Sequence, residues 1–294
     1  MSREYIQIQD FDLCQYNSFR IASNAKVVFF PYSTEGVRQL FLDLGDIKPV
    51  ILGNGSNTIF SNDICTAPVI ISSFLNKISF INNIISVGSG VSLSTLSWFA
   101  LEKLRTGFEF LEDIPGSVGG ALYMNAGTYN DCIGDKVHSA LVYDYKARKI
   151  LSIDKQQLSP FWGKRDSFFQ HFPCFIISCQ LEAYLTDSYE DILNRQLSIK
   201  QKRYLKQPRN YPSAGSVFKR PYVNGESYYV WKLIDEAGLR GYRIGDAQVS
   251  TKHPGFIVNV GNASGKNVVD LMNYCKKMIY QKYNIQLNEE WIIV

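Results

Sequence analysis

The chain has 294 residues, of which 46% are hydrophobic and 14% aromatic, so it can bury a sizeable core, and its length favours roughly two domains or three small ones. These proportions exclude a disordered or fibrous protein. The formal net charge is only +4, which is too small to indicate nucleic-acid or membrane-surface binding, so any anionic ligand has to be met locally.

The hydropathy pattern indicates a cytoplasmic protein without membrane insertion. No run approaches the length of about 18 apolar residues that a membrane span needs. The start MSREYIQIQDFDL has neither the basic region nor the apolar core of a signal peptide. The cysteines form no CxxC pair, so we predict buried thiols rather than disulfides or a zinc site at Cys14, Cys65, Cys132, Cys174, Cys179 and Cys275.

The pattern of the first part of the chain predicts a small α/β unit. Short β-rich runs are separated by a helix-like stretch at 35–44 and by the sequence GNGSN. The predicted strands are 27–30, 50–52 and 69–72.

Between 78 and 184 the pattern changes to strands interrupted by two Gly-rich turns. The predicted strands are 84–87, 140–144, 149–153 and 175–181. One helix is expected here, with Ser92 or Ser94 as its N-cap and Gly107 at its end. Its apolar positions recur at helical spacing and are Leu93, Leu96, Ala100 and Leu104.

Two helices are predicted in the last third of the chain. The first starts at Tyr189 and stops before Pro208, since proline cannot continue a helix. A turn-rich segment follows at 212–221. The second helix has one apolar face made of Val268, Leu271, Met272, Cys275 and Ile279. The tail 289–294 is predicted as a strand.

The run LGNGSN at 52–57 follows a predicted strand and combines two glycines with small polar residues. Such a composition exposes consecutive backbone N–H groups, which suit a phosphate, although a plain tight turn is an equally open interpretation. It is neither the GxGxxG of a dinucleotide-binding turn nor a Walker A motif.

A second Gly-rich run extends from Ile114 to Gly120 and continues at Asn125–Gly127. Its glycine density lets main-chain amides approach a flat or anionic ligand, and ligand contact is favoured over a plain connecting loop.

Other candidate residues are ambiguous from their own surroundings. Ser213 and Ser216 lie in a turn that lacks a GxSxG elbow, and the three histidines have no triad spacing, which argues against a serine hydrolase. Arg165 can stack on aromatics, pair with Asp166 or hold a carboxylate. The basic residues between Lys200 and Arg209 form either a solvated helix end or an anion clamp.

Taken in order, these segments resemble the UDP-N-acetylenolpyruvoylglucosamine reductase (MurB) family, in its shorter form without the extra tyrosine loop. The resemblance covers nearly the whole chain. The segments that carry it are LGNGSN (52–57), GFEFLEDIPGSVGGALYMNAGTY (107–129), KRDSFF (164–169), KQPRNYPSAGSVFKRP (206–221), AGLRGYRIGDAQVSTKHPGFIVN (237–259) and Glu290.

The resemblance implies an α+β flavoprotein with an FAD-binding fold of the vanillyl-alcohol-oxidase-like type. Two α/β subdomains, 1–73 and 74–187, would enclose FAD, and an α+β domain at 188–285 would bind the substrate. The C-terminal strand 286–294 would return to the active site.

The resemblance also assigns cofactor contacts, with FAD bound non-covalently. The pyrophosphate would lie against Gly53, Asn54, Gly55, Ser56 and Asn57. The rest of the flavin would be lined by Ile114, Pro115, Gly116, Ser117, Gly119, Gly120, Asn125, Gly127 and Arg203.

The family reaction transfers a hydride from NADPH through FAD to an enolpyruvyl UDP-sugar, in peptidoglycan precursor synthesis. The catalytic positions match Arg165 for the carboxylate, Ser216 for the proton at C2 and Glu290 for the enol-like intermediate. Period-two alternation of the tail favours Glu290 over Glu289. The substrate-binding positions match Lys206, Lys219 and His253.

The sequence features bear on two other functions. A flavin oxidase on the same scaffold often carries covalent flavin, but no histidine lies in the Gly-rich loops here. A nucleic-acid-binding module could use the basic cluster with Tyr204, but the net charge is small and no RNP, KH or zinc pattern is present.

Overall fold

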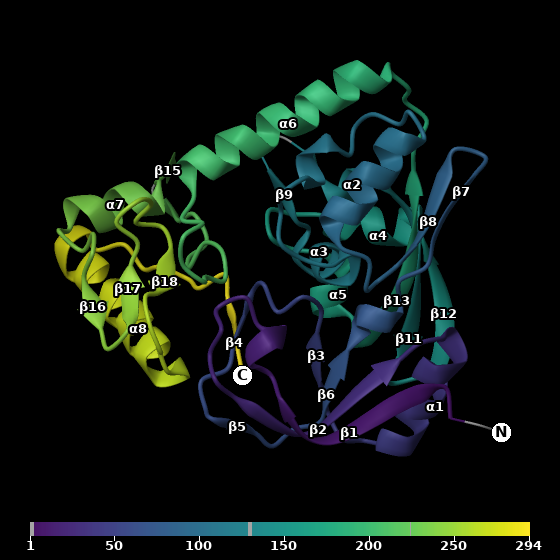
Figure 1. Cartoon of the computed structure of the whole chain (residues 1–294), viewed down its shortest axis with the longest axis horizontal. Helices are drawn as coiled ribbons and strands as arrows, with labels where there is room; N and C mark the ends of the chain where they lie inside the picture. Colours follow the sequence, from purple (N-terminus) through teal and green to yellow (C-terminus); the bar gives the residue numbers. More distant parts are fainter. Residues whose placement is uncertain (1–2, 129–130, 224) are drawn as a thin grey trace. The chain divides into compact units, whose positions relative to one another are not determined.

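The computed structural model describes residues 3–128, 131–223 and 225–294, and the chain forms two compact units (Figure 1). Unit 1 consists of Met1–Ile8, Val27–Asn54 and Ala67–Arg203, and unit 2 of Gln9–Lys26, Gly55–Thr66 and Tyr204–Val294. The three predicted domains and their boundaries stay a prediction. Tyr129, which ends one of the family-like segments, lies outside the described residues.

The first sheet of unit 1 contains the predicted α/β unit. Its strand order is β1-β2-β6-β3, and β2, β6 and β3 are parallel, with Val28 and Val50 both paired to Val69. Ser33 caps the connecting helix α1 by accepting a hydrogen bond from the Gly36 N–H. The predicted strands and helix are confirmed as β2 (Asn24–Pro31), α1 (Thr34–Leu44), β3 (Val50–Leu52) and β6 (Val69–Ile71). The edge strand β1 (Tyr5–Asp12) had not been predicted.

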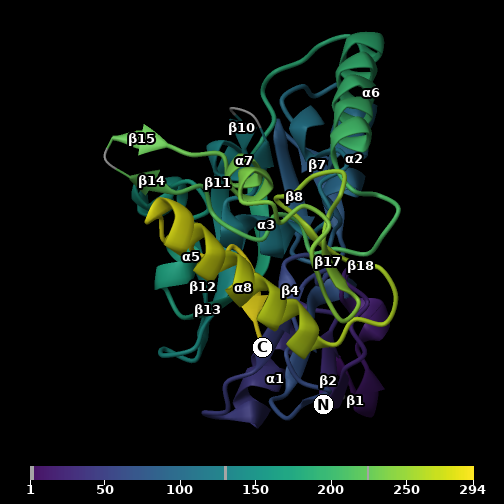
Figure 2. The ribbon, with the colours of Figure 1, turned by 90° about the vertical axis from the view of Figure 1, so that its left-hand side faces the viewer.

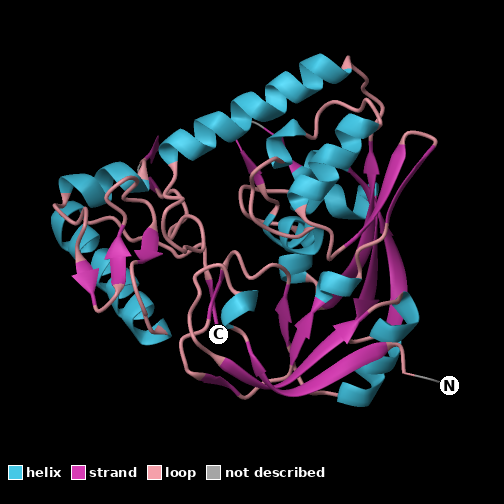
Figure 3. Cartoon of the chain, in the orientation of Figure 1, coloured by secondary structure: helices cyan, strands magenta, loops and turns pink. Residues whose placement is uncertain are grey.

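The second sheet of unit 1 is antiparallel, in the order β12-β11-β13-β8-β7 (Figure 3). Alternate residues of β11 enter different cores, because side chains alternate between the faces of a strand. Val142 packs with α2 and α3, whereas Tyr143 stacks on Phe41 of α1 with ring centroids 4.8 Å apart. The elements are β7 (Ile78–Ile81), β8 (Ile84–Gly88), α2 (Leu93–Glu102), α3 (Val118–Met124), β11 (Val137–Asp144), β12 (Lys149–Asp154) and β13 (Cys174–Glu182).

Helix α2 begins as predicted but ends earlier. Ser92 is its N-cap and accepts a hydrogen bond from the Thr95 N–H. The helix ends at Glu102, so the prediction that Gly107 ends it was wrong. Leu104 follows in a left-handed conformation with φ of 56° and is 45% exposed, so it does not belong to the buried stripe.

The second Gly-rich run is not only a turn, because its second half forms α3. Ser117 caps this helix through the Gly120 N–H, and the Val118 N–H donates to the Val91 carbonyl at 2.9 Å. Glycine has a low helix propensity, so composition alone pointed to a turn. The Ser117 cap and the hydrogen bond to the Val91 carbonyl stabilise the helix despite its glycines.

Several shorter elements complete unit 1, and the long helix α6 follows them. Helix α6 ends two residues before Pro208, as predicted. Its buried Gln196 donates to the carbonyl of Ser97 at 2.9 Å. The elements are β9 (Gly127–Thr128), β10 (Asp131–Cys132), α4 (Lys155–Leu158), α5 (Phe168–His171) and α6 (Tyr189–Lys206).

Unit 2 is built on a three-stranded antiparallel sheet, β16-β17-β18, and helix α8 packs on β16 and β17 (Figure 2). All five predicted apolar positions of α8 are buried, which confirms that helix. The tail forms a strand that pairs in parallel with β4. The elements are β4 (Thr58–Ile59), β5 (Ile64–Cys65), β14 (Tyr222–Val223), β15 (Glu226–Ser227), α7 (Val230–Glu236), β16 (Arg243–Ile244), β17 (Ala247–Val249), β18 (Ile257–Asn259), α8 (Gly265–Tyr283) and β19 (Ile292–Ile293).

The thiols only partly follow the prediction. All six cysteines are free, and Cys65, Cys179 and Cys275 are buried, but Cys14, Cys132 and Cys174 are half-buried. Within the described residues, no helix is long and apolar enough to cross a membrane. The same part of the chain holds no group of three potential metal ligands.

Candidate active site

The two Gly-rich runs meet in unit 1. A Cβ atom at Gly53 would collide with the hydroxyl oxygen of Ser117, the N-cap of α3, so glycine permits this approach without displacing that hydroxyl. A Cβ atom at Gly119 would likewise collide with the Ser89 side chain, and the Gly119 N–H donates to the Ser89 carbonyl at 2.8 Å. The structure therefore brings together two segments that were assigned to the same cofactor from sequence.

These segments carry polar groups that the described chain leaves without partners. Within the described residues, the N–H groups of Gly53, Asn54, Gly55 and Ser56 donate to no acceptor. The hydroxyl of Ser89 is buried and has no hydrogen-bond partner in that part of the chain. At Gly120 a Cβ would meet only the Ser117 hydroxyl, at 3.6 Å. Within unit 1, the unsatisfied amides of Gly53 and Asn54 and the open position at Gly120 fit a phosphate-bearing flavin.

Gly55, which belongs to unit 2, has a different reason to be glycine. Its φ of +59° is left-handed, and a Cβ there would collide with the backbone of Tyr16. The Gly55 carbonyl accepts the Ser18 N–H at 3.1 Å. This glycine therefore anchors the end of the LGNGSN segment to the chain at 16–18.

Arg165 lies in a tight turn of unit 1 that is bonded to the end of α3. The turn is closed by hydrogen bonds between Gly163 and Asp166, and Arg165 has a φ of 60°, which is disfavoured for residues with a Cβ. Asn125, the C-cap of α3, donates to the Gly163 carbonyl at 2.7 Å. The Arg165 guanidinium reaches the Gly127 carbonyl at 3.4 Å. Two predicted cofactor residues thus support the predicted catalytic arginine.

Arg203, near the end of α6, is bonded to the loop that precedes Ile114. Its guanidinium donates to the Asp113 carbonyl at 3.2 Å and lies 3.4 Å from the Asp113 carboxylate. The Asp113 backbone is left-handed, with φ of 68°. Arg203 therefore orients the start of the second Gly-rich run.

In unit 2 the segment from Ser216 to Lys219 lies between two other segments. On one side, the Glu290 N–H donates to the Val217 carbonyl and the Lys219 N–H donates to the Asn288 carbonyl, both at 2.8 Å. On the other side, Ser216 forms a backbone bridge with Phe256. Ser216, Lys219 and Glu290 are consequently brought to neighbouring backbone positions.

The C-terminal segment distinguishes Glu290 from Glu289. Glu289 pairs with Lys276 of α8 at 2.8 Å, and that hydrogen bond lowers the pKa of the Glu289 carboxyl. The burial of Leu287 and Trp291 assigns Glu289 to the core-facing side of the segment, by alternation. The Asn57 amide donates to the Glu290 carbonyl at 2.9 Å. The two carboxylates therefore have different surroundings, and the assignment of the catalytic position to Glu290 stays a prediction.

The surroundings of His253 favour the neutral form of its imidazole. Its Nδ1 accepts the Gly255 N–H at 3.2 Å, and its ring packs against Phe256 at 5.0 Å. Burial lowers the pKa of this imidazole. A neutral imidazole whose Nδ1 accepts a hydrogen bond has its Nε2–H left to donate.

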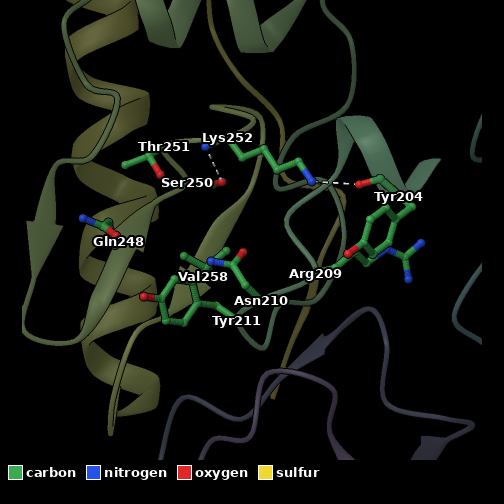
Figure 4. Close-up of a pocket in the computed structure, with 9 residues that line it drawn as sticks. All are labelled: Tyr204, Arg209, Asn210, Tyr211, Gln248, Ser250, Thr251, Lys252 and Val258. Atoms are coloured by element: carbon green, nitrogen blue, oxygen red, sulfur yellow. Dashed lines mark hydrogen bonds between the residues drawn. The ribbon is translucent and has the colours of Figure 1, made fainter. Parts of the chain in front are cut away.

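A polar pocket of about 260 Å³ lies in unit 2 (Figure 4). The Ser250 hydroxyl accepts the N–H groups of both Lys252 and His253 at 3.2 Å, which fixes the turn that borders the pocket. Two lining residues are cations and none is a carboxylate, so an anionic ligand suits it. The lining residues are Tyr204, Arg209, Asn210, Tyr211, Gln248, Ser250, Thr251, Lys252 and Val258.

Some residues stand apart from sequence expectation. Lys206 is exposed at the end of α6, and its ammonium forms no hydrogen bond or ion pair with another predicted site residue within the described chain. Neither Gln170 nor Ser89 was predicted from the sequence as a site residue. Gln170 donates to the Arg165 carbonyl at 3.1 Å, but a glutamine after two phenylalanines gives no sequence signal for this hydrogen bond. Ser89 is recognisable only through its burial against Gly119.

Comparisons with known proteins identify the family. Residues 25–150 match the FAD binding domain family, and residues 207–294 match the family described as UDP-N-acetylenolpyruvoylglucosamine reductase, C-terminal domain. A protein of that reductase name from Francisella tularensis is 38% identical over 294 residues, covering 99% of both chains. The chain belongs to the UDP-N-acetylenolpyruvoylglucosamine reductase family.

Other members of the family agree over nearly the full length. The Petrotoga mobilis reductase is 37% identical and covers 94% of this chain and 90% of its own. The crystal structure of the Thermus caldophilus reductase (MurB) matches with a TM-score of 0.79 and 27% identity, covering 98% of both chains. These findings confirm the predicted α+β fold with an FAD-binding domain, and the family resemblance.

Proposed function

We propose that the chain is an FAD-dependent reductase that uses NADPH to reduce the enolpyruvyl group of UDP-N-acetylglucosamine enolpyruvate to UDP-N-acetylmuramate. The observation that carries this proposal is the full-length similarity to proteins named as this reductase, at 38% identity over 99% of the chain. The step would belong to cytoplasmic synthesis of peptidoglycan precursors, and so to cell-wall biogenesis, cell shape and division.

The residues that would hold FAD non-covalently are those of the two Gly-rich runs, together with Arg203. Amides at 53–56 suit the pyrophosphate, because they donate to nothing else in the described chain. Bound FAD would supply hydride chemistry, accepting a hydride from NADPH and delivering it to C3 of the enolpyruvyl group.

Arg165 would hold the carboxylate of the enolpyruvyl group. Negative charge grows at C2 and at this carboxylate as the hydride arrives at C3, so a fixed guanidinium stabilises the transition state more than the ground state. Its planar fork can donate two parallel hydrogen bonds to a carboxylate. The turn that carries Arg165 is bonded to α3, which limits its freedom.

Ser216 would donate the proton to C2, and Glu290 would hydrogen-bond the enol-like intermediate. A serine hydroxyl is a weak acid, but a carbanion-like carbon is strongly basic, so the transfer is feasible when a cation is near. Lys219, three residues along the same segment, is such a cation, and Lys206 is the other candidate. The lysines and His253 would bind the rest of the substrate.

An anaerobic assay tests the proposal. Purified protein should oxidise NADPH only when the enolpyruvyl UDP-sugar is present, and UDP-N-acetylmuramate should form in equal amount. Hydrogen peroxide production in air, without reduction of the sugar nucleotide, would instead indicate a flavin oxidase. A colourless protein that binds no FAD would contradict both.

A further inference from the structure

Gln170 connects the arginine turn to the end of α3. Its side-chain amide donates to the Tyr123 carbonyl at 2.8 Å and to the Arg165 carbonyl at 3.1 Å. Tyr123 lies in the last turn of α3, where carbonyls lack a partner within the helix. One amide group therefore ties a helix end to the backbone of Arg165.

The Arg165 backbone needs such support because its conformation is unfavourable. A φ of 60° places a residue with a long side chain in the left-handed region, which persists only when its surroundings fix it. Ser167, fully buried, donates to the same Tyr123 carbonyl at 2.7 Å, and Asn125 holds the other side of the turn through Gly163. Gln170, unlike these two residues, donates to the Arg165 carbonyl itself.

We propose that Gln170 is a positioning residue, which fixes the Arg165 turn against α3 so that the guanidinium is presented to the substrate carboxylate. This inference rests on the proposed function, in which Arg165 holds that carboxylate. Because the donated hydrogen bonds keep the turn in place, their loss leaves Arg165 chemically intact but freer to take other orientations. Misplacement of about 1 Å can cost about 100-fold in rate.

Three variants separate the roles of shape, donor and charge. Gln170→Glu keeps the size of the side chain but removes the N–H donors and places negative charge beside two carbonyls. Gln170→Lys keeps a donor of similar reach. Gln156→Glu, at an exposed position of α4, makes the same charge change away from the turn and serves as the matched control.

The measurements follow FAD-loaded protein under anaerobic conditions. In Gln170→Glu, reoxidation of the reduced flavin by the enolpyruvyl substrate should slow by at least about tenfold, because the carboxylate site is disordered. Flavin reduction by NADPH and the melting temperature should match the Gln156→Glu control. Gln170→Lys should recover part of the reoxidation rate. The calorimetric Kd for UDP-N-acetylmuramate, which keeps the carboxylate, should rise by about three- to tenfold in Gln170→Glu.

A double-mutant cycle tests whether Gln170 acts through Arg165. In an Arg165→Ala background, Gln170→Glu should slow reoxidation no further, because no guanidinium is left to position. An equal additional loss in that background would overturn the inference, as would a native reoxidation rate in Gln170→Glu. A parallel fall of both half-reactions with a lowered melting temperature would also overturn it, since that is a structural role. Failure of the unaltered protein to reduce the substrate would instead reject the proposed function.

Discussion

Ser213 and Ser216 lie in one turn of unit 2, but they have different surroundings. The carbonyl of Ser213 accepts a hydrogen bond from the Ser18 hydroxyl at 2.8 Å. Ser216 is exposed and lies in the segment that is paired with the Glu290 backbone. The proposed proton transfer therefore distinguishes two residues that look alike in the sequence.

Ser216→Ala should slow flavin reoxidation by the enolpyruvyl substrate by at least about 100-fold, the lower end of general-acid contributions. FAD binding and flavin reduction by NADPH should stay near the native values, because neither step needs a proton at C2. Rapid-mixing absorbance under anaerobic conditions follows the two half-reactions separately. Ser213→Ala controls for damage to the turn and should behave nearly as the unaltered chain. A native reoxidation rate in Ser216→Ala would show that Ser216 is not the proton donor.

Arg165→Ala should weaken use of the enolpyruvyl substrate, because it removes a charge-assisted pair worth about 1.5–3 kcal/mol. Arg165→Lys should restore only part of kcat/KM, since an ammonium cannot reproduce the planar fork. Steady-state kinetics with saturating NADPH measure both variants. Full activity in Arg165→Ala would move the role elsewhere, and Lys164, next to it in the turn, would be tested first.

At the scale of elements, regular helices were predictable and the cofactor segment was not. Helix α8 was evident from five apolar positions at helical spacing, all of which are buried. Helix α3 was hidden by Gly119 and Gly120, because its formation depends on Ser117 and on the Val91 carbonyl from a distant segment. The contact between Gly53 and Ser117 likewise joins residues far apart in the chain, and no local pattern announces it.

Among the site residues, too, some features were predictable from the sequence and others were not. Their identities followed from the resemblance of ordered segments to a known family. The supports followed only from the structure, since Asn125, Gln170 and Asp113 act by bonding to backbone carbonyls or to Arg203. Backbone acceptors carry no sequence signature. Positioning residues are therefore the part of this site that sequence reasoning cannot reach.

Helix α6 is tied to the segment after α2 by a buried carboxylate. Glu109 accepts hydrogen bonds from Arg195 of α6 at 2.9 Å, from Thr106 at 2.7 Å and from the Gly107 N–H at 2.6 Å. Burial by itself would raise the pKa of Glu109, but these hydrogen bonds outweigh it and leave the pKa below the ordinary 4.5. The carboxylate form is therefore favoured by folding.

A carboxyl group whose pKa is lower in the folded chain than in the unfolded chain stabilises the fold at pH values above the unfolded-state pKa. This stabilisation is lost as the pH falls through the folded-state pKa. Arg195→Met should destabilise the chain at pH 7 by about 1–3 kcal/mol, towards the lower end because Arg195 is 43% exposed and water can replace it. The deficit should shrink as the pH falls below about 4.5 and through the lower pKa at which Glu109 takes up a proton in the folded chain. Thermal melts of both proteins between pH 7 and pH 3 measure the difference. A deficit that did not change with pH would exclude the ionised Glu109 as its source.

At the scale of the whole molecule, FAD should contribute to stability as a non-covalent ligand. Acid precipitation should release all of the yellow chromophore, whereas flavin retained in the pellet would show a covalent bond. A ligand present at 100 times its Kd stabilises the folded state by about 2.7 kcal/mol. Removing FAD should therefore lower the melting temperature by several degrees, and added FAD should restore it. Equal melting temperatures with and without FAD would contradict the assigned cofactor segments.

The two compact units each enclose a thiol that is sealed from solvent. Cys179 on β13 is 2% exposed and Cys275 on α8 is 1% exposed, and burial raises the pKa of both thiols, that of Cys275 to about 12. An alkylating reagent attacks the thiolate, so neither sulfur can react until its own core opens. The alkylation rate of each cysteine therefore reports how often its core opens. The mass-labelling rate at Cys179 would time the opening of unit 1, and the rate at Cys275 would time the opening of unit 2, in a single native sample.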